Sequence, residues 1–245
     1  MILRRITNAF RRQDWFTVGI ETLIVVLGVF LGLQAQEWAA DQAEKAGIEA
    51  QLSSFREELV QRQDEIDAHK TYIEHRIDDT RTLRSDLMNP DQPLSQDDIY
   101  RLAMSSVRTI GLNVTFHGFN ELSASGALSK IKSAPLLKGL YQWDASLTNL
   151  RSTERDVKTL RDVANMPDIL GSLSFGNMAR TDPRFSDLPA DHRFNVDVEG
   201  LRTSRDFDNA LVSRLILEQQ NFNALIDFQN ATNDLITALE TERKK

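Results

Sequence analysis

An apolar run near the start of the chain constrains its fold more than any other feature. Residues 16–33, FTVGIETLIVVLGVFLGL, contain a single ionisable side chain, Glu21. A tryptophan flanks the run on each side, and residues 1–14 contain four Arg and one Asp. This length, with basic residues before it and aromatic residues at both edges, is typical of a membrane-spanning helix. We therefore predict a transmembrane helix over residues 15–38.

A basic start followed by an apolar stretch also describes a cleaved secretory signal. Such a signal has a shorter apolar core and small residues around the cut, but the exit segment QAQEW, residues 34–38, has no A-x-A pattern. An uncleaved anchor is therefore favoured. Because the more positive flank stays in the cytoplasm, we predict a cytoplasmic basic tail, residues 1–14, and an outer domain, residues 39–245. In a Gram-negative bacterium the anchor would lie in the inner membrane and the domain in the periplasm.

Composition favours a helical outer domain. The chain is 27% charged and has only 11 Gly and 6 Pro in 245 residues, which leaves little material for turn-rich β architecture. The absence of cysteine excludes disulfides, thiolate metal sites and a cysteine nucleophile. The net charge of −7 argues against a nucleic-acid partner, because such binding depends on clustered Lys and Arg. The lipid bilayer is the simpler partner for the basic tail.

The predicted span has two unlike faces. At about 100° per residue, small side chains share one face, while Leu23, Leu27 and Phe30 lie opposite. Helices in lipid associate through close backbone approach, so the small face is predicted to contact a second copy of this chain or another membrane protein. The alternative is a chance Gly-x-x-x-Gly match. This small-residue face consists of Thr17, Glu21, Gly28, Gly32, Ala35 and Ala39.

Glu21 is the one acidic member of the small-residue face. An ionised carboxylate inside the bilayer costs a few kcal/mol, so this group should be protonated, be paired or reach the head groups. Two interpretations stay open: a hydrogen bond to a partner helix, and a carboxylate that reaches water near the interface. A proton relay is disfavoured, because one ionisable group in one span makes no pathway.

Two segments carry patterns that go beyond hydropathy. Residues 14–38 begin aromatic-x-x-Gly-Ile-Glu and end Gly-Val-Phe-Leu-Gly-Leu-Gln, and residues 119–143 contain Glu-Leu-x-x-Ser-Gly-x-Leu. These patterns resemble a set of uncharacterised bacterial single-span membrane proteins, many of them proteobacterial. The resemblance is close over residues 14–40, looser over 116–143 and absent over 166–205. It implies an inner-membrane protein with a helical outer domain, and it supplies no catalytic residues.

Helical spacing continues after the span. Between Asp41 and Met88 there is no Pro and one Gly, and apolar residues recur at intervals of three, four and seven. This predicts one helix from the membrane to about Met88. The pattern is only partly that of a coiled coil, because Arg62, His69 and Arg76 occupy seam positions where a dimeric coil would have Leu. We therefore expect packing against other helices of the same chain, with self-association as the alternative.

Breaker residues divide the remaining chain. Asn89–Pro93 ends the first helix, Ser95 is a predicted N-cap, and Gly126 is a predicted hinge. Further long helices are predicted from Ser133 to about Ala164 and from Asp206 to about Glu242. Three long helices and several short ones predict an all-α, up-and-down helical bundle.

The stretch between the second and third long helices has a different composition. Residues 166–205 contain three Pro, three Gly and many Asp. Such a stretch is either a functional excursion or a mobile connection. We predict a long surface loop with an ordinary connecting function.

No motif predicts catalysis, a cofactor or a metal site. The sequence GSLSFG at 171–176 has one residue too many for a nucleophile elbow, and Ser129–Lys132 lacks the companion motifs of S-x-x-K enzymes. His69 and His75 would face different ways on a helix. The Asp residues of 182–191 lack the ligand pattern of a calcium loop. The chain is therefore predicted not to be an enzyme.

Two classes of function remain. The favoured one is a membrane-anchored bundle that acts as an interaction or scaffold module. The alternative is a ligand-sensing input module that signals through the span to a separate partner, because the 14 residues before the span are too few for an output domain.

Overall fold

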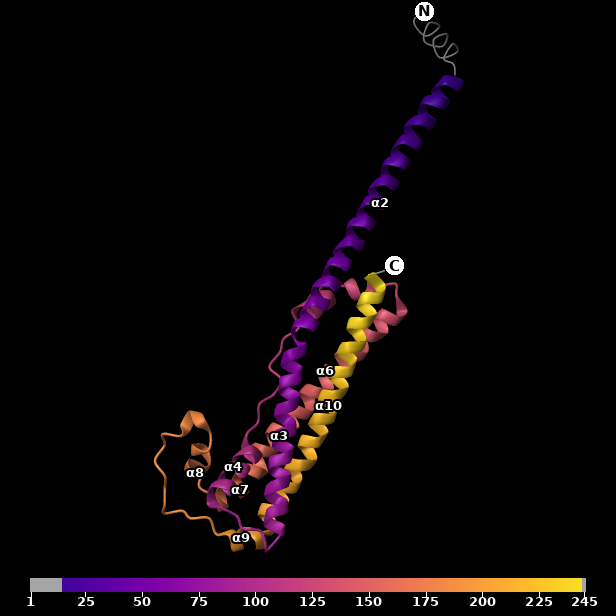
Figure 1. Ribbon diagram of the computed structural model, residues 1–245. Coiled ribbons are helices and arrows are strands. Elements are labelled where there is room, and N and C mark those ends of the chain that lie inside the picture. Colours follow the sequence, from indigo (N-terminus) through magenta and orange to yellow (C-terminus); the bar gives the residue numbers. More distant parts are fainter. Residues whose placement is uncertain (1–14, 244–245) are drawn as a thin grey trace, which may run out of the picture. The chain divides into compact units, whose positions relative to one another are not determined.

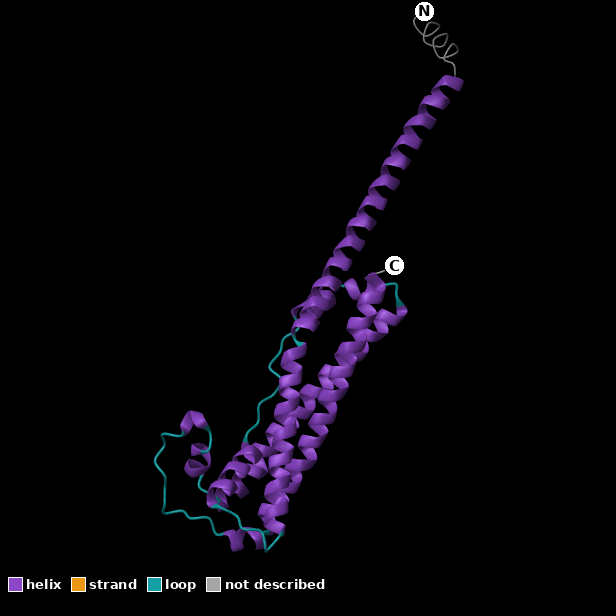
Figure 2. Ribbon diagram, viewed as in Figure 1, coloured by secondary structure: helices purple, strands orange, loops and turns teal. Residues whose placement is uncertain are grey.

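The computed structural model describes residues 15–243, and all regular structure in that range is helical (Figure 2). No strand occurs among these residues. The chain divides into two compact units, Met1–Leu52 and Ser53–Lys245. The predicted all-α class is therefore confirmed.

The described part of the first unit is a single helix. Helix α2 (Trp15–Gln61) is 47 residues long and continues past the end of this unit (Figure 1). From Gly19 to Gly47 every side chain is exposed. One long apolar helix near the N-terminus is thus confirmed, and the predicted basic tail, residues 1–14, lies outside the described residues.

Helix α3 (Gln63–Met88) follows α2 after the single residue Arg62. Hydrogen bonds run across this junction, from Arg62 N to Glu58 O and from Ile66 N to Arg62 O, both 3.1 Å. The predicted continuous helix to Met88 is confirmed. It stops there because Pro90 disfavours helical backbone at Asn89, which is extended with φ −101° and ψ 104°.

Three long helices frame the second unit: α3, α6 (Ala134–Leu160) and α10 (Arg205–Arg243) (Figure 1). Helix α10 packs against both of the others. It runs antiparallel to each, because residue numbers fall along α10 as they rise along its neighbours. The contacts that show this are Gln63 with Asn233 (2.9 Å), Arg84 with Asp208 (2.8 Å), Trp143 with Thr232 (3.1 Å) and Thr153 with Asn221 (3.0 Å).

Since α3 and α6 both oppose α10, they run parallel to each other. The chain returns from the end of α3 to the start of α6 through α4 (Gln96–Val107), the extended segment 108–116 and two short helices. The predicted simple up-and-down order is therefore not confirmed. The breaker residues show where helices stop, but they do not show which of the long helices become neighbours.

Local signals place the short helices of this return. Ser95 Oγ accepts a hydrogen bond from Asp98 N at 3.1 Å and so caps α4 as predicted. Gly126, with φ 75°, separates α5 (His117–Ala124) from η1 (Ala127–Lys130), which confirms the predicted hinge. The left-handed backbone at this position favours glycine.

The predicted loop 166–205 contains a series of short helices, so that prediction is wrong over much of the segment. Pro183 is compatible with helix because it lies in a first turn, where no backbone N–H is needed, and Pro167 lies in the turn that directly follows a π-helical turn. Apolar side chains between the breakers, such as Ile169 and Met178, are buried in the core. The elements are α7 (Met166–Ser172), α8 (Phe175–Arg180), η3 (Pro183–Phe185) and α9 (Val198–Thr203), and a π-helical turn, η2 (Arg161–Asn165), directly precedes them.

The interior of the second unit has an apolar region at each end of the long helices. One is an aromatic cluster whose ring centroids lie 4.9 to 5.9 Å apart, and each fully buried ring contributes about 1.5–3 kcal/mol. The other joins the end of α3 to α4, α7 and the start of α10. The aromatic cluster consists of Phe55, Phe116, Phe119, Trp143 and Phe228; the second cluster includes Leu83, Leu87, Ile99, Phe207 and Leu211.

Candidate functional site

A layer of buried polar side chains lies between these two apolar clusters. Its centre is Glu218, whose Oε1 accepts a hydrogen bond from the guanidinium group of Arg76 and forms an ion pair with that of Arg214. Arg214 and Glu218 lie one turn apart on α10, and Arg76 comes from α3. All three are at most 4% exposed. We call His69, Arg76, Arg214, Glu218 and Asn221 the polar layer.

The arginines of the polar layer also bind the backbone of the return segment. Arg214 Nη2 donates to Arg108 O at 2.6 Å and to Thr109 Oγ1 at 3.1 Å, and Arg76 Nε donates to Ser105 O at 3.4 Å. The carbonyls of Ser105 and Arg108 belong to the last turn and the C-cap of α4, where no later helical N–H is available to satisfy them. The two guanidinium groups therefore fix the return segment to the long helices.

A second carboxylate, Glu154, lies beside His69 of the polar layer. His69 Nε2 lies 3.4 Å from Glu154 Oε1 on α6, and this oxygen accepts a hydrogen bond from Leu112 N at 2.6 Å. Burial raises the pKa of the Glu218 carboxyl, while the positive charge of Arg76 acts in the opposite direction. Each carboxylate of this region thus contacts a basic side chain from another turn or another helix.

The polar layer is closed to solvent. Arg214 Nε and Nη1 and Glu218 Oε2 are buried and have no hydrogen-bond partner among the described residues. A substrate could not reach these atoms without a change in the packing of α3 against α10. The arrangement can hold helices in register, and it gives no direct route to catalysis.

The sequence contained part of the signal for the polar layer. The seam positions that lack Leu include His69 and Arg76, and both are buried, while Arg62 is half-buried. Sequence reasoning missed Arg214 and Glu218. Their spacing of four residues places them on one helix face, but the same spacing is common in exposed ion pairs.

The predicted small-residue face lies on the exposed part of α2. Glu21, Gly28, Gly32, Ala35 and Ala39 are all exposed, and nothing lies within 4 Å of a Cβ built on either glycine. The side chain of Thr17 lies outside the described residues. Helix geometry brings these positions to one face, and no other described part of the chain contacts that face.

A polar cleft of about 510 Å³ lies between α4, α8 and the segment 190–195. Two of its lining residues hold the segment in place: Asn177 pairs with the backbone of Asp191, and Tyr100 Oη donates to Phe194 O at 2.9 Å. Arg180, at the end of α8, also lines the cleft. The cleft is therefore built on hydrogen-bonded walls.

The sequence Asp-x-Arg-Phe occurs twice beside this cleft, at 182–185 and 191–194. In both copies the Asp carboxylate accepts hydrogen bonds from the backbone N, Nε and Nη2 of the Arg two residues on. The guanidinium carbon lies over the next Phe ring, 5.5 Å and 5.4 Å from the ring centroids. These clamps make rigid surface features, and sequence reasoning did not notice the repeat.

The hydrogen bonds of the clamps stabilise the ionised carboxylates. The guanidinium and backbone N–H of Arg184 hold the pKa of the Asp182 carboxyl well below its usual range, and Arg193 lowers the pKa of Asp191 to about 2. Asp182 also pairs with Arg108 at 3.1 Å. The acidic run examined as a calcium loop is thus largely paired with arginine. No group of three or more His, Asp or Glu positioned to hold a metal ion occurs among residues 15–243.

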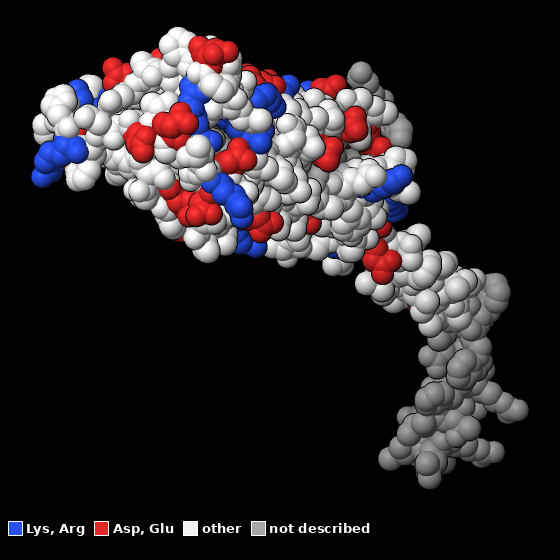
Figure 3. All heavy atoms as spheres, turned by 90° about the horizontal axis from the view of Figure 1, so that it is seen from below, with Lys and Arg blue, Asp and Glu red and all other residues white. Residues whose placement is uncertain are grey.

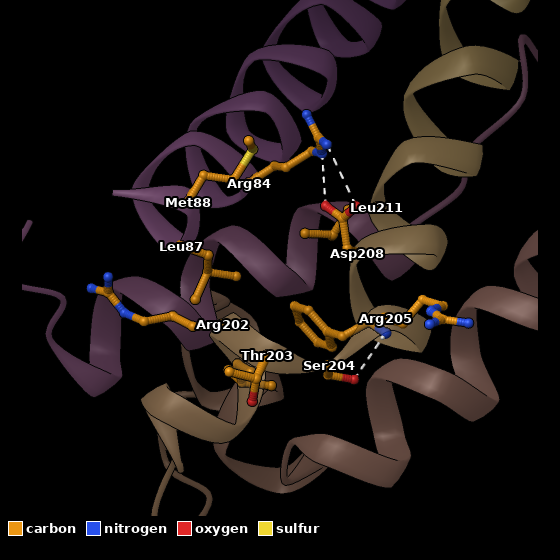
Figure 4. Close-up of a pocket in the computed structure, with 11 residues that line it drawn as sticks. Arg84, Leu87, Met88, Arg202, Thr203, Ser204, Arg205, Asp208 and Leu211 are labelled. Atoms are coloured by element: carbon orange, nitrogen blue, oxygen red, sulfur yellow. Dashed lines mark hydrogen bonds and ion pairs between the residues drawn. The ribbon is translucent and has the colours of Figure 1, made fainter. Parts of the chain in front are cut away.

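A smaller hollow of about 240 Å³ lies where α3 ends and α10 begins (Figure 4). Arg84 closes one side through its ion pair with Asp208, 2.8 Å, and Leu87 and Leu211 form apolar walls. Arg202 donates to the carbonyl oxygens of Asn89 and Gln92, so it fastens α9 to the end of α3. The residues around the hollow thus hold α3, α9 and α10 together, which is a structural role.

Charge is mixed over the surface of the bundle. Figure 3 shows acidic and basic side chains interspersed on the face that it presents, without a continuous basic area. Ser129, from the S-x-x-K match, is exposed and donates to Gly126 O at 2.7 Å, an ordinary turn interaction. This turn interaction gives Ser129 no activating base.

Comparisons of the chain with protein-family models, with curated proteins and with solved structures find no match. The resemblance to bacterial single-span proteins therefore stays a prediction.

Proposed function

We propose that the chain is a single-pass membrane protein of the bacterial inner membrane, whose periplasmic helical bundle acts as an interaction or scaffold module. The observation that carries this proposal is the exposed apolar segment of α2. Its 18-residue window has a mean hydropathy of 1.6 and is 0% buried by the described chain. Such a segment requires an apolar environment from outside the chain.

The bilayer fits this segment in length and in symmetry. Eighteen helical residues rise about 27 Å, close to the roughly 30 Å hydrocarbon thickness of a membrane. Large apolar side chains between Ile20 and Leu33 are at least 41% exposed and surround the helix except at the small-residue face. A helix that docks on one protein surface needs one apolar face, whereas a helix surrounded by lipid needs apolar side chains on all of them.

The free energy of transfer from water also favours the bilayer for this segment. Ten large aliphatic or aromatic side chains of this segment are exposed, and transferring each from water contributes on the order of 1.5–3 kcal/mol. Together they amount to about 15 kcal/mol or more, which exceeds the cost of inserting the single carboxylate of Glu21. The ten are Ile20, Leu23, Ile24, Val25, Val26, Leu27, Val29, Phe30, Leu31 and Leu33.

Orientation follows from charge. Residues 1–14 carry a net charge of +3, and the whole chain carries −7. The positive flank favours the cytoplasm, and the acidic bundle then lies outside.

Cysteine labelling tests anchoring and orientation cleanly, because the chain has no cysteine of its own. We expect a membrane-impermeant maleimide to label Ser152→Cys, on the exposed side of α6, in cells with a permeable outer membrane. Asn8→Cys should be labelled only after lysis, and carbonate washing should leave both proteins in the membrane. The opposite labelling pattern would reverse the orientation, and release by carbonate would refute the anchor.

The interaction role is carried by the small-residue face. Because the built Cβ atoms of Gly28 and Gly32 meet nothing in the described chain, Ile at these positions should change only contacts with another molecule. We expect Gly28→Ile and Gly32→Ile to reduce cross-linking of the full-length protein in membranes, to itself or to a stoichiometric partner. Gly19→Ile, which also meets nothing within 4 Å, is the matched control. Equal cross-linking in all three variants would exclude this face.

A further inference from the structure

The polar cleft between α4, α8 and residues 190–195 has the size and the construction of a small-molecule site. Its volume of about 510 Å³ falls within the range of ligand pockets. Its lining is mostly amide, carboxylate, hydroxyl and guanidinium groups. The lining includes Asp97, Asp98, Tyr100, Asn177, Arg180 and Asp191.

One wall of the cleft is fixed before any ligand arrives. Asn177 Nδ2 donates to Asp191 O at 2.9 Å, and Asp191 N donates to Asn177 Oδ1 at 3.0 Å. Tyr100, which is 4% exposed, donates from Oη to Phe194 O and accepts from Asn177 Nδ2 at 3.2 Å. A wall held in this way loses little conformational freedom on binding, and this favours affinity.

Most charges around the cleft are already paired. Asp191 is held by Arg193, and Arg101 contacts Asp98 at 3.5 Å and Asp79 at 3.7 Å. Arg180 is different, since it forms no hydrogen bond or ion pair with any described residue. Its side chain is half-buried, and its Nε is buried without a partner.

The buried Nε of Arg180 is costly, because this N–H group loses water without gaining an acceptor, and the guanidinium as a whole has no counter-charge among the described residues. A carboxylate offers two acceptors in the planar geometry that a guanidinium matches. Arg180 is therefore the natural docking point for an anionic group in this cleft.

The opposite side of the cleft is acidic and therefore disfavours a ligand that carries only negative charge. Asp97 and Asp98 lie in the first turn of α4, and Asp97 has no ion-pair partner among the described residues. These carboxylates repel a polyanion, but they attract a cationic group on the same ligand.

We propose that this cleft binds a zwitterion of the amino-acid class, with its carboxylate on Arg180 and its ammonium facing Asp97 and Asp98. Free amino acids and short peptides share this chemistry. The site is independent of the membrane anchor and of the small-residue face, so failure of either proposal leaves the other standing.

Calorimetric titration of the full-length protein in detergent tests the proposal. The probes are glycine, L-glutamate, L-arginine and the dipeptide alanyl-alanine, with sodium acetate and inorganic phosphate as anions that lack an ammonium group. We expect saturable binding of at least one zwitterion and weaker or no binding of acetate and phosphate. Preference for the dipeptide over the free amino acids would identify a peptide end as the source of the zwitterion.

Substitutions assign the two halves of the site. Arg180→Gln should weaken binding of the zwitterion by about tenfold or more, because it removes a charge-assisted hydrogen-bonding group. Arg180→Lys, which keeps the charge but not the planar fork, should have a smaller effect. Asp97→Asn should weaken binding a few-fold, since Asp97 is exposed and its charge is screened.

Matched controls separate binding from folding. Arg155 is exposed on α6 and its side chain has no partner in the described structure, and Asp206 lies in the first turn of α10 as Asp97 does in that of α4. Arg155→Gln and Asp206→Asn should bind as the unmodified protein does, and all variants should keep its circular dichroism. Absence of binding by every zwitterion, equal binding of phosphate, or unchanged binding by a folded Arg180→Gln variant would overturn the proposal.

Discussion

The second unit uses Arg–carboxylate pairs in two settings. In the polar layer, Glu218 contacts Arg76 and Arg214 in the interior, where all three are almost fully buried. In the clamps, Arg184 and Arg193 stand on the surface, with side chains 64% and 81% exposed. The buried groups join three distant parts of the chain. Each clamp joins residues two positions apart, and its one long-range ion pair is that of Asp182 with Arg108 in the first clamp. Removing one member should therefore have a global effect in the first setting and a local effect in the second.

The sharpest test of this difference removes the central carboxylate. Glu218→Ala leaves two buried guanidinium groups without their counter-charge, so we expect a loss of about 3–5 kcal/mol in the free energy of unfolding. Urea denaturation of the full-length protein in detergent, followed by circular dichroism, measures it. The control is Asp227→Ala, an exposed position on the same helix, which should change stability by no more than about 0.5 kcal/mol. A similar small effect at Glu218 would show that the polar layer is not held by its charges.

A smaller effect is expected when the whole charged group is replaced. The triple variant Arg76→Met, Glu218→Leu, Arg214→Met removes charges and counter-charges together, so it should recover much of the stability lost by Glu218→Ala. Recovery should be incomplete, because Arg108 O loses the hydrogen bond from Arg214. The same denaturation assay applies. A triple variant less stable than the single one would mean that the hydrogen bonds to the return segment matter more than charge balance.

The smallest effect concerns pH and the clamps. The pKa values of Asp182 and Asp191 are lower in the folded chain than in the unfolded one, with Asp191 at about 2. Their contribution to stability is therefore present at neutral pH and is lost as pH falls below about 4. Pepsin should begin to cut the segment 182–194 only as the pH approaches 2.

The variants decide whether the clamps cause this protection. The double variant Asp182→Asn, Asp191→Asn should be cut in the same segment already near pH 4, while Asp187→Asn, an exposed carboxylate of the same segment, should behave as the unmodified protein. If the double variant is cut no earlier, the segment is held by the hydrogen bonds of Asn177 and Tyr100 rather than by the clamps.

The sequence predicted those parts of the fold that depend on local chemistry. Pro90 after Asn89, the capping side chain of Ser95 and the hinge at Gly126 each act within a few residues, and each boundary is confirmed. Likewise, an apolar run without proline at residues 16–33 predicts a helix from its own length and composition. Local signals of this kind need no knowledge of the neighbours.

The parts that depend on distant contacts could not be predicted. The pairing of Arg76 with Glu218 spans 142 positions, and nothing in either local sequence shows that the two will meet. In residues 166–205, the breakers suggested a loop, but tertiary burial of residues such as Ile169 and Met178 stabilises short helices that would not persist alone. The cleft shares this origin, since its walls come from α4 and from a segment about 90 residues later.

The π-helical turn of Arg161–Asn165 changes the direction in which the side chains after it point. Along α6 and its continuation, the buried positions Val157 and Asn165 lie eight residues apart, on either side of most of this turn. A regular α-helix has 3.6 residues per turn, so eight residues would rotate the side chain of Asn165 by about 80° relative to that of Val157. A wider turn takes up this excess, and Asn165 within it donates to Ala210 O on α10 at 2.5 Å. The extra residue of this turn therefore keeps the buried side chains before and after it on the same side of the helix, the side that faces α10.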